Sequence, residues 1–168
     1  MQDKKEETSQ AIHDLSQVFK FELWLRFYFI QEKEEKLVLN LDDQILQKIR
    51  ENYGHLAELA QELNQKEELT PEICRKAIVD HIQHQFDGHK YQAGLVPQIL
   101  DHSIFNTEIQ LFNTWASLHE DQLDQKVLDF EKWLELFNEW KQSDSAQKVA
   151  QSIKMEEQQQ HPGSQKIQ

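Results

Sequence analysis

A run of histidines and aspartates holds the densest group of potential metal ligands in the chain. Its members are Asp80, His81, His84, Asp87 and His89. Asp80 and His84 lie four residues apart, so a helix would place both on the same side. With Asp87 and His89 folded back, the run offers nitrogen and oxygen donors suited to zinc or another divalent ion. Charged histidines near a helix C-terminus are also stabilised by the helix dipole, so their presence needs no metal to explain it. Metal binding is therefore kept as an alternative hypothesis for the function of the chain.

Other spacing rules for catalysis and cofactor binding are not met. The chain has no Glu-x-x-His pair of the di-iron bundles, no His-Glu-x-x-His, no Cys-x-x-Cys, and no glycine-rich phosphate loop. It also lacks the Gly-x-Ser-x-Gly turn that presents a nucleophilic serine. We therefore expect no cofactor and no enzymatic activity.

Two consecutive segments carry large aromatic side chains at helical spacing. These are Phe105, Phe112 and Trp115 on one, and Phe130, Trp133, Phe137 and Trp140 on the next. Rings in this pattern are typical of a core in which two helices join their apolar faces. A half-exposed Trp24 or Trp140 would instead be an anchor for a partner protein. Beside them, Glu131, Glu135 and Glu139 recur every fourth residue and predict an acidic ridge that would attract a basic partner.

The net negative charge of the chain argues against two classes of partner, nucleic acids and membranes. The 18 Lys and Arg against 30 Asp and Glu give a formal net charge of −12. Such a charge repels phosphate backbones and anionic lipid heads, so we expect no nucleic-acid and no membrane partner. Cys74 is the single cysteine, and the first residues carry no apolar run of a signal peptide. These features predict a soluble protein in the reducing cytoplasm.

Most of the chain has the periodicity and end signals of helices. Helices are predicted to start at Asp42 or Asp43, at Thr70-Pro71, at Ser103 and at Asp129, because each offers an N-terminal capping side chain. Gly54 should bend or break the first of them. Residues 88–97 hold two of the four glycines and one of the three prolines, and predict a loop or hinge.

Residues 18–41 fit two structures. Large apolar side chains alternate from Phe19 to Phe29, which favours a strand with Trp24, Arg26 and Tyr28 on its other face. Leu37, Leu39 and Leu41 would then form the returning strand, although the turn between contains no Gly, Asn or Pro. As a helix, the segment would bring Glu22 and Arg26 together four residues apart, beside an apolar stripe of Ile12, Leu15, Phe19, Leu23, Phe27 and Ile30. We favour the hairpin.

The predicted fold class is mainly α: one compact domain of about four or five helices, with an N-terminal β-hairpin over residues 18–41. Residues 1–9 should be flexible, residues 10–141 should form the helical domain, and residues 142–168 a Gln-rich, largely disordered tail with one short helix at Val149 and Ile153.

The leading hypothesis for function is a non-enzymatic protein-binding module, such as an adaptor, an assembly factor or a chaperone-like protein. Its binding residues would be Trp24, Arg26, Tyr28, Trp140 and the acidic ridge. Its partner would be another protein, and a basic one would suit the acidic ridge. The first alternative is a metal-binding protein that uses residues 80–89. The second is an acidic mimic of nucleic acid, for which the ridge is short.

Overall fold

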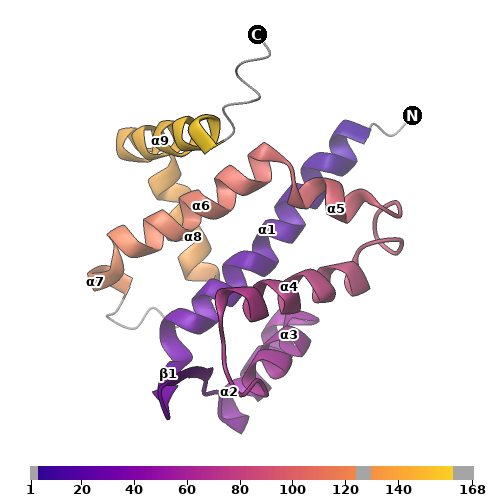
Figure 1. Ribbon diagram of the computed structural model, residues 1–168, viewed down its shortest axis with the longest axis vertical. Helices are drawn as coiled ribbons and strands as arrows, with labels where there is room; N and C mark the ends of the chain where they lie inside the picture. The colour runs from indigo at the N-terminus through magenta and orange to yellow at the C-terminus, as the bar shows by residue number, and fades with distance from the viewer. Residues whose placement is uncertain (1–3, 124–129, 161–168) are drawn as a thin grey trace. The chain divides into compact units, whose positions relative to one another are not determined.

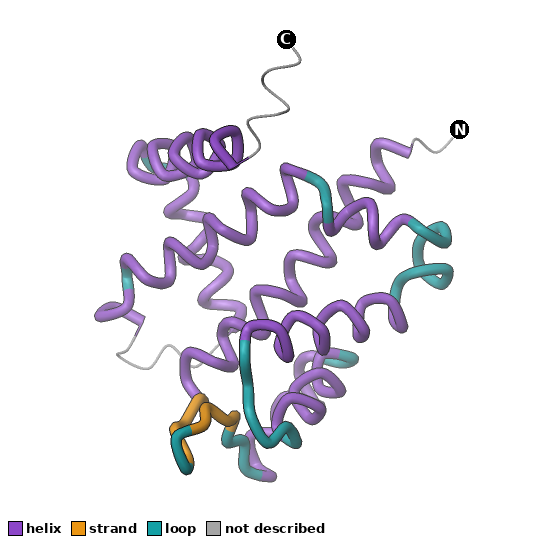
Figure 2. Tube along the Cα trace, viewed as in Figure 1, coloured by secondary structure: helices purple, strands orange, loops and turns teal. Residues whose placement is uncertain are grey.

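The computed structural model describes residues 4–123 and 130–160 (Figure 1). The fold is mainly α, as predicted, with more helices than the predicted four or five and one short hairpin (Figure 2). The chain divides into two compact units, Met1–Asp101 (unit 1) and His102–Gln168 (unit 2), and the boundary falls inside the range predicted as one domain. No helix in the described ranges has the length and apolar character needed to cross a membrane.

Unit 1 is built around its first and longest helix. It contains α1 (Lys4–Phe29), the hairpin β1 (Ile30–Lys33) and β2 (Lys36–Leu39), α2 (Asp43–Tyr53), α3 (Leu56–Asn64), α4 (Pro71–Gln85) and α5 (Leu95–Leu100). Helix α1 packs against α3, α4 and α5 (Figure 1). The largest fully buried apolar side chains of this unit are Leu15, Phe21, Leu25, Ile49, Leu59, Leu63, Ile82 and Ile99.

The prediction of a strand over residues 18–29 is wrong, because this segment continues α1. The alternation of apolar residues does not require a strand where a helix is buried on more than one face. Ala11, Leu15, Val18 and Leu25 are buried. Of the stripe expected for a helix, only Leu15 is among them, and its other members are half-buried: Ile12, Phe19, Leu23, Phe27 and Ile30. Glu22 and Arg26 form the ion pair that the helical alternative required.

The hairpin follows directly after α1 and spans only ten residues. Ile30 pairs with Leu39 and Lys33 with Lys36, so that Glu34 and Glu35 form a two-residue turn. Both glutamates adopt left-handed backbone angles, with φ of +52° and +67°. Two positive φ angles are the requirement of the type I′ turn, which Asn-Gly satisfies best.

We expect the double substitution Glu34→Asn, Glu35→Gly to raise the free energy of unfolding by about 1 kcal/mol, because Glu is strained in this region and Asn-Gly is not. Urea denaturation followed by circular dichroism measures the change. The control Glu34→Gln, Glu35→Gln removes the same two charges and keeps both β-carbons. An equal gain in the control would show that charge, not backbone strain, limits stability at this turn.

Several predicted helix ends are confirmed. The backbone N–H of Ile45 donates to the Asp42 carboxylate over 2.9 Å, and that of Ile73 donates to the Thr70 hydroxyl over 3.1 Å. Gly54, with φ of +55°, separates α2 from α3. The cap predicted at Ser103 is instead His102, whose Nδ1 accepts from the backbone N–H of Ile104.

The predicted loop over residues 88–97 is shorter than expected. Helix α5 begins at Leu95 and takes in Pro97, which lies in its first turn, where proline is tolerated. At the N-terminus, α1 begins at Lys4, inside the segment predicted to be flexible; residues 1–3 lie outside the described residues.

Unit 2 contains α6 (Ser103–Leu118), α7 (Glu120–Leu123), α8 (Phe130–Lys141) and α9 (Asp144–Gln160). Helix α6 packs against α7, α8 and α9, and α8 packs against α9. The predicted cap Asp129 lies outside the described residues.

Helix α9 is longer than the short helix predicted in the tail. Ala146 and Ile153 are buried and Val149 lies half-buried between them, which makes a stripe at helical spacing. The Ser143 hydroxyl accepts from the backbone N–H of Ala146 and caps the helix. Residues 161–168 of the predicted tail lie outside the described residues.

Candidate functional site

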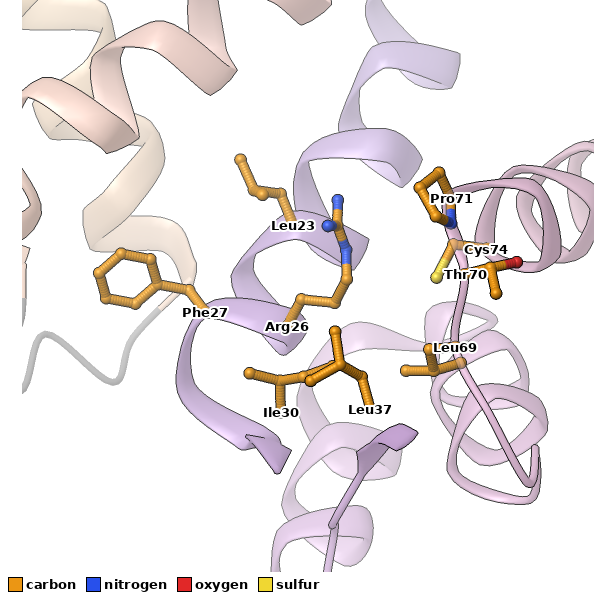
Figure 3. A pocket seen from close by; sticks show the side chains of 9 residues that line it. All are labelled: Leu23, Arg26, Phe27, Ile30, Leu37, Leu69, Thr70, Pro71 and Cys74. Carbon is orange, nitrogen blue, oxygen red and sulfur yellow. The ribbon is translucent and has the colours of Figure 1, made fainter. Parts of the chain in front are cut away.

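An apolar groove of about 320 Å³ lies in unit 1, between the end of α1, the hairpin and the start of α4 (Figure 3). Its lining is mainly apolar: Leu23, Phe27, Ile30, Leu37, Leu69 and Pro71, with Arg26, Thr70 and Cys74 as the more polar members. Leu37 is 50% exposed, which makes it one of the few large apolar side chains with so much surface in water among the described residues. The volume falls at the lower end of the range of ligand pockets.

Three separate segments position the lining. Leu23, Arg26 and Phe27 follow helical spacing and share one face of α1 (Figure 3). The hairpin is held beside the linker before α4 by a hydrogen bond of 2.7 Å from the backbone N–H of Leu69 to the carbonyl of Leu37. The linker then passes through Thr70 and Pro71, the cap and first residue of α4.

A second set of bonds fixes the chain after the hairpin. The side-chain amide of Asn64 accepts from the backbone N–H of Leu41 over 2.8 Å and donates to its carbonyl over 3.2 Å. This amide therefore pairs with the backbone as a neighbouring strand would. The end of α3 and the end of the hairpin are joined in this way.

The charged side chain of the groove, Arg26, is neutralised by a neighbouring carboxylate. Glu22 is buried and accepts two bonds from the Arg26 guanidinium, at 2.5 and 3.1 Å. Burial opposes the charge of Arg26, but the adjacent Glu22 carboxylate outweighs burial and raises the pKa of Arg26. Burial, together with Glu22, raises the pKa of Cys74 to about 12. The thiol thus stays protonated at neutral pH and is a poor nucleophile.

The structure places the sequence-predicted binding residues in different surroundings. Trp24 is only 3% exposed and packs against the rings of Phe21, Tyr28, Phe29 and Tyr53, so it has no free face for a partner. Arg26 lines the groove and Tyr28 is half-buried. In unit 2, Trp140 is half-buried against the rings of His119 and Phe137. Glu131, Glu135 and Glu139 are exposed along α8.

The five residues of the proposed metal site have other partners or lie apart. Asp80 pairs with Lys76 at 2.9 Å, and the Asp87 carboxylate accepts from the backbone N–H of Gly94. His84 and His89 are exposed, whereas His81 is buried. Over residues 4–123 and 130–160, no three or more His, Cys, Asp or Glu side chains are grouped so that they could hold a metal ion.

A histidine pair, in which His81 is buried and His55 is exposed, joins α4 to the start of α3. His55 Nδ1 lies 2.9 Å from His81 Nε2, and the two rings stack with centroids 5.1 Å apart. The edge of Phe86 packs on His55. Burial, and after it the proximity of the rings of His55 and His84, lowers the pKa of His81 to about 4, and partial burial also lowers the pKa of His55. Both rings are therefore neutral at pH 7.

A second polar cluster ties α1 to the loop before α5. The Asp14 carboxylate accepts from Lys90 Nζ over 2.8 Å, from Gln10 over 3.0 Å, and from the Tyr91 hydroxyl. Burial alone would raise the pKa of Asp14, but these hydrogen bonds lower it. Burial and the bond to Asp14 raise the pKa of Tyr91.

Sequence reasoning missed the groove and the histidine pair. A signal for His81 exists, because it follows Cys74, Ala77 and Ile78 at helical spacing and so belongs to the apolar stripe of α4. His55 carries no such signal, since it lies in the break between two helices. Comparison with known protein families, with curated proteins and with solved structures finds no match for this chain.

Proposed function

We propose that the protein is a non-enzymatic protein-binding module, and that the groove of unit 1 takes an apolar part of its partner. The observation that carries this proposal is the half-exposed Leu37 at the mouth of an apolar groove, held in place by the bond from Leu69. Large apolar side chains are costly to leave in water, and contiguous exposed apolar surface, such as Leu37 together with the groove lining, marks interaction sites.

The lining favours a polypeptide over a small polar substrate. Substrate pockets place a few polar groups to orient the ligand, whereas Arg26 here is already paired with Glu22. The protonated Cys74 offers no reactive group at neutral pH. The size suits one or two apolar side chains, the anchors through which protein partners dock. A cytoplasmic location belongs to this proposal, because Cys74 is free and buried.

Peptide selection tests the proposal. A random peptide library displayed on phage should yield peptides with apolar anchors on the wild-type protein. We expect Leu37→Glu to weaken these peptides about tenfold or more, because it places a charge in the apolar groove. Titration calorimetry measures the change. The matched control is Ile104→Glu in unit 2, which alters another exposed apolar residue, 61% exposed against 50% for Leu37, and should leave binding unchanged.

Two results would contradict the proposal. One is a selection that enriches no peptide on the wild-type protein. The other is a set of peptides that bind Leu37→Glu as tightly as the wild type, because their site would then lie elsewhere.

A further inference from the structure

We propose that the occupant of the groove is a basic amphipathic segment of another protein, with an apolar anchor in the groove and Lys or Arg side chains against the glutamates of the hairpin and of the linker before α4. This inference rests on the proposed function and adds the chemistry of the partner. We call these glutamates the acidic rim: Glu32, Glu34, Glu35, Glu67, Glu68 and Glu72.

The acidic rim flanks the groove on two sides. Glu32, Glu34 and Glu35 belong to the hairpin that contributes Ile30 and Leu37 to the lining. Glu67, Glu68 and Glu72 come directly before and after the lining residues 69–71. All six are exposed, and in the described part of the chain none of them forms an ion pair. Their negative charge therefore faces solvent.

Few cations of the same region offset this charge. Residues 31–36 and 67–72 hold the six glutamates and two lysines, Lys33 and Lys36. The next cations along the chain have partners of their own. Lys66 pairs with Glu62, Lys76 pairs with Asp80, and Arg75 lies over the ring of Phe19.

The groove itself does not repel a basic segment. Arg26, its one cation, is neutralised by Glu22, to which it donates two hydrogen bonds. The lining of the groove is thus apolar and neutral, and the acidic rim beside it is negative. This arrangement is complementary to an apolar anchor flanked by positive charge. A second copy of this chain fits poorly, because it carries the same net charge of −12.

Three synthetic amphipathic peptides, identical in their leucines and differing only in Lys, Gln or Glu at the polar positions, test the inference. Binding to the full chain is measured by fluorescence anisotropy at low and at high salt. We expect the Lys peptide to bind at least about tenfold tighter than the Gln peptide at low salt, and the Glu peptide to bind weakest. High salt should remove most of this preference, because the rim charges are exposed.

Two sets of variants locate the effect. Glu32→Gln, Glu67→Gln, Glu68→Gln removes three rim charges that lie outside helices, and should lower the preference for Lys over Gln to about twofold or less. The matched control Glu131→Gln, Glu135→Gln, Glu139→Gln removes three exposed charges of α8 and should keep the preference. Leu37→Glu should weaken both the Lys and the Gln peptide.

The outcomes separate this inference from the proposed function. If the Lys and Gln peptides bind equally and both depend on Leu37, the groove binds protein as proposed, but the inference of a basic partner is wrong. If the preference for Lys disappears equally in the α8 variant, or survives in the rim variant, general charge attraction explains it and the inference fails. If sedimentation shows a dimer of the wild-type chain and a monomer of Leu37→Glu, a second copy is the occupant of the groove. This result would also overturn the inference.

Discussion

Trp133→Ala is expected to lower the free energy of unfolding of unit 2 by about 3–5 kcal/mol, since truncating a fully buried aromatic residue loses both its burial and the packing around it. Trp133 is 0% exposed. Its ring meets Phe112 with centroids 6.0 Å apart and Trp115 edge-on at 5.5 Å. Phe137 closes the cluster, with its ring 4.9 Å from that of Phe112. Urea denaturation followed by circular dichroism measures the loss.

The control for Trp133→Ala is Glu135→Ala on the same helix. Glu135 is exposed and forms an ion pair of 3.6 Å with Lys132. Because exposed ion pairs contribute little to stability, this change should lower the free energy of unfolding by about 0.5 kcal/mol or less. Leu134→Ala, at a half-buried position, should fall between the two. A Trp133→Ala protein with an unchanged denaturation midpoint would show that the ring cluster does not hold unit 2 together.

This aromatic cluster is the part of the fold that the sequence predicted best. Large rings at intervals of three and four residues can be buried on one face of a helix, and no other local structure uses that spacing. Six of the seven predicted rings, Phe105, Phe112, Trp115, Phe130, Trp133 and Phe137, are buried, and Trp140 is half-buried. The sequence predicts such a core because its members lie close together along the chain.

Helix α1 shows why the same reasoning failed elsewhere. Its apolar residues surround much of the helix, so they also fit the period of a strand. The pair of Glu22 and Arg26 counted against a buried helix until the structure showed their mutual neutralisation. The turn at Glu34 and Glu35 carries none of the residues that normally signal a hairpin. The alternation of apolar residues therefore misplaced the start of the hairpin.

The groove lay beyond the reach of the sequence for a different reason. Its lining comes from the end of α1 with the hairpin, and from the linker and start of α4, which lie more than thirty residues further along the chain. Only Arg26 among them was predicted to take part in binding. Periodicity identifies which residues share a face of one element, but it does not tell which elements meet. The hydrogen bond from Leu69 to Leu37 joins two such elements, the linker before α4 and the hairpin.

Acid is expected to destabilise unit 1 through the histidine pair. His81 has an ordinary pKa of 6.5 and a folded pKa of about 4, so the unfolded chain binds the proton more tightly. The stabilisation is complete above pH 6.5 and is lost as the pH falls from 6.5 towards 4. Between pH 7 and pH 5 the free energy of unfolding should fall by about 2 kcal/mol, in a range where few carboxylates titrate.

The groups around the pair do not reverse this sign, because burial is the largest influence on both rings. His55 and His84 oppose a charge on His81, while Glu58 and Asp14 favour and Lys90 opposes a charge on His55. His81→Gln should remove most of the decrease between pH 7 and pH 5 in urea denaturation, whereas the control His89→Gln, at an exposed position, should keep it. The ring resonances of His81 in NMR should titrate well below pH 6. A His81→Gln protein that loses stability with acid as steeply as the wild type would mean that the pair is not the origin of the effect.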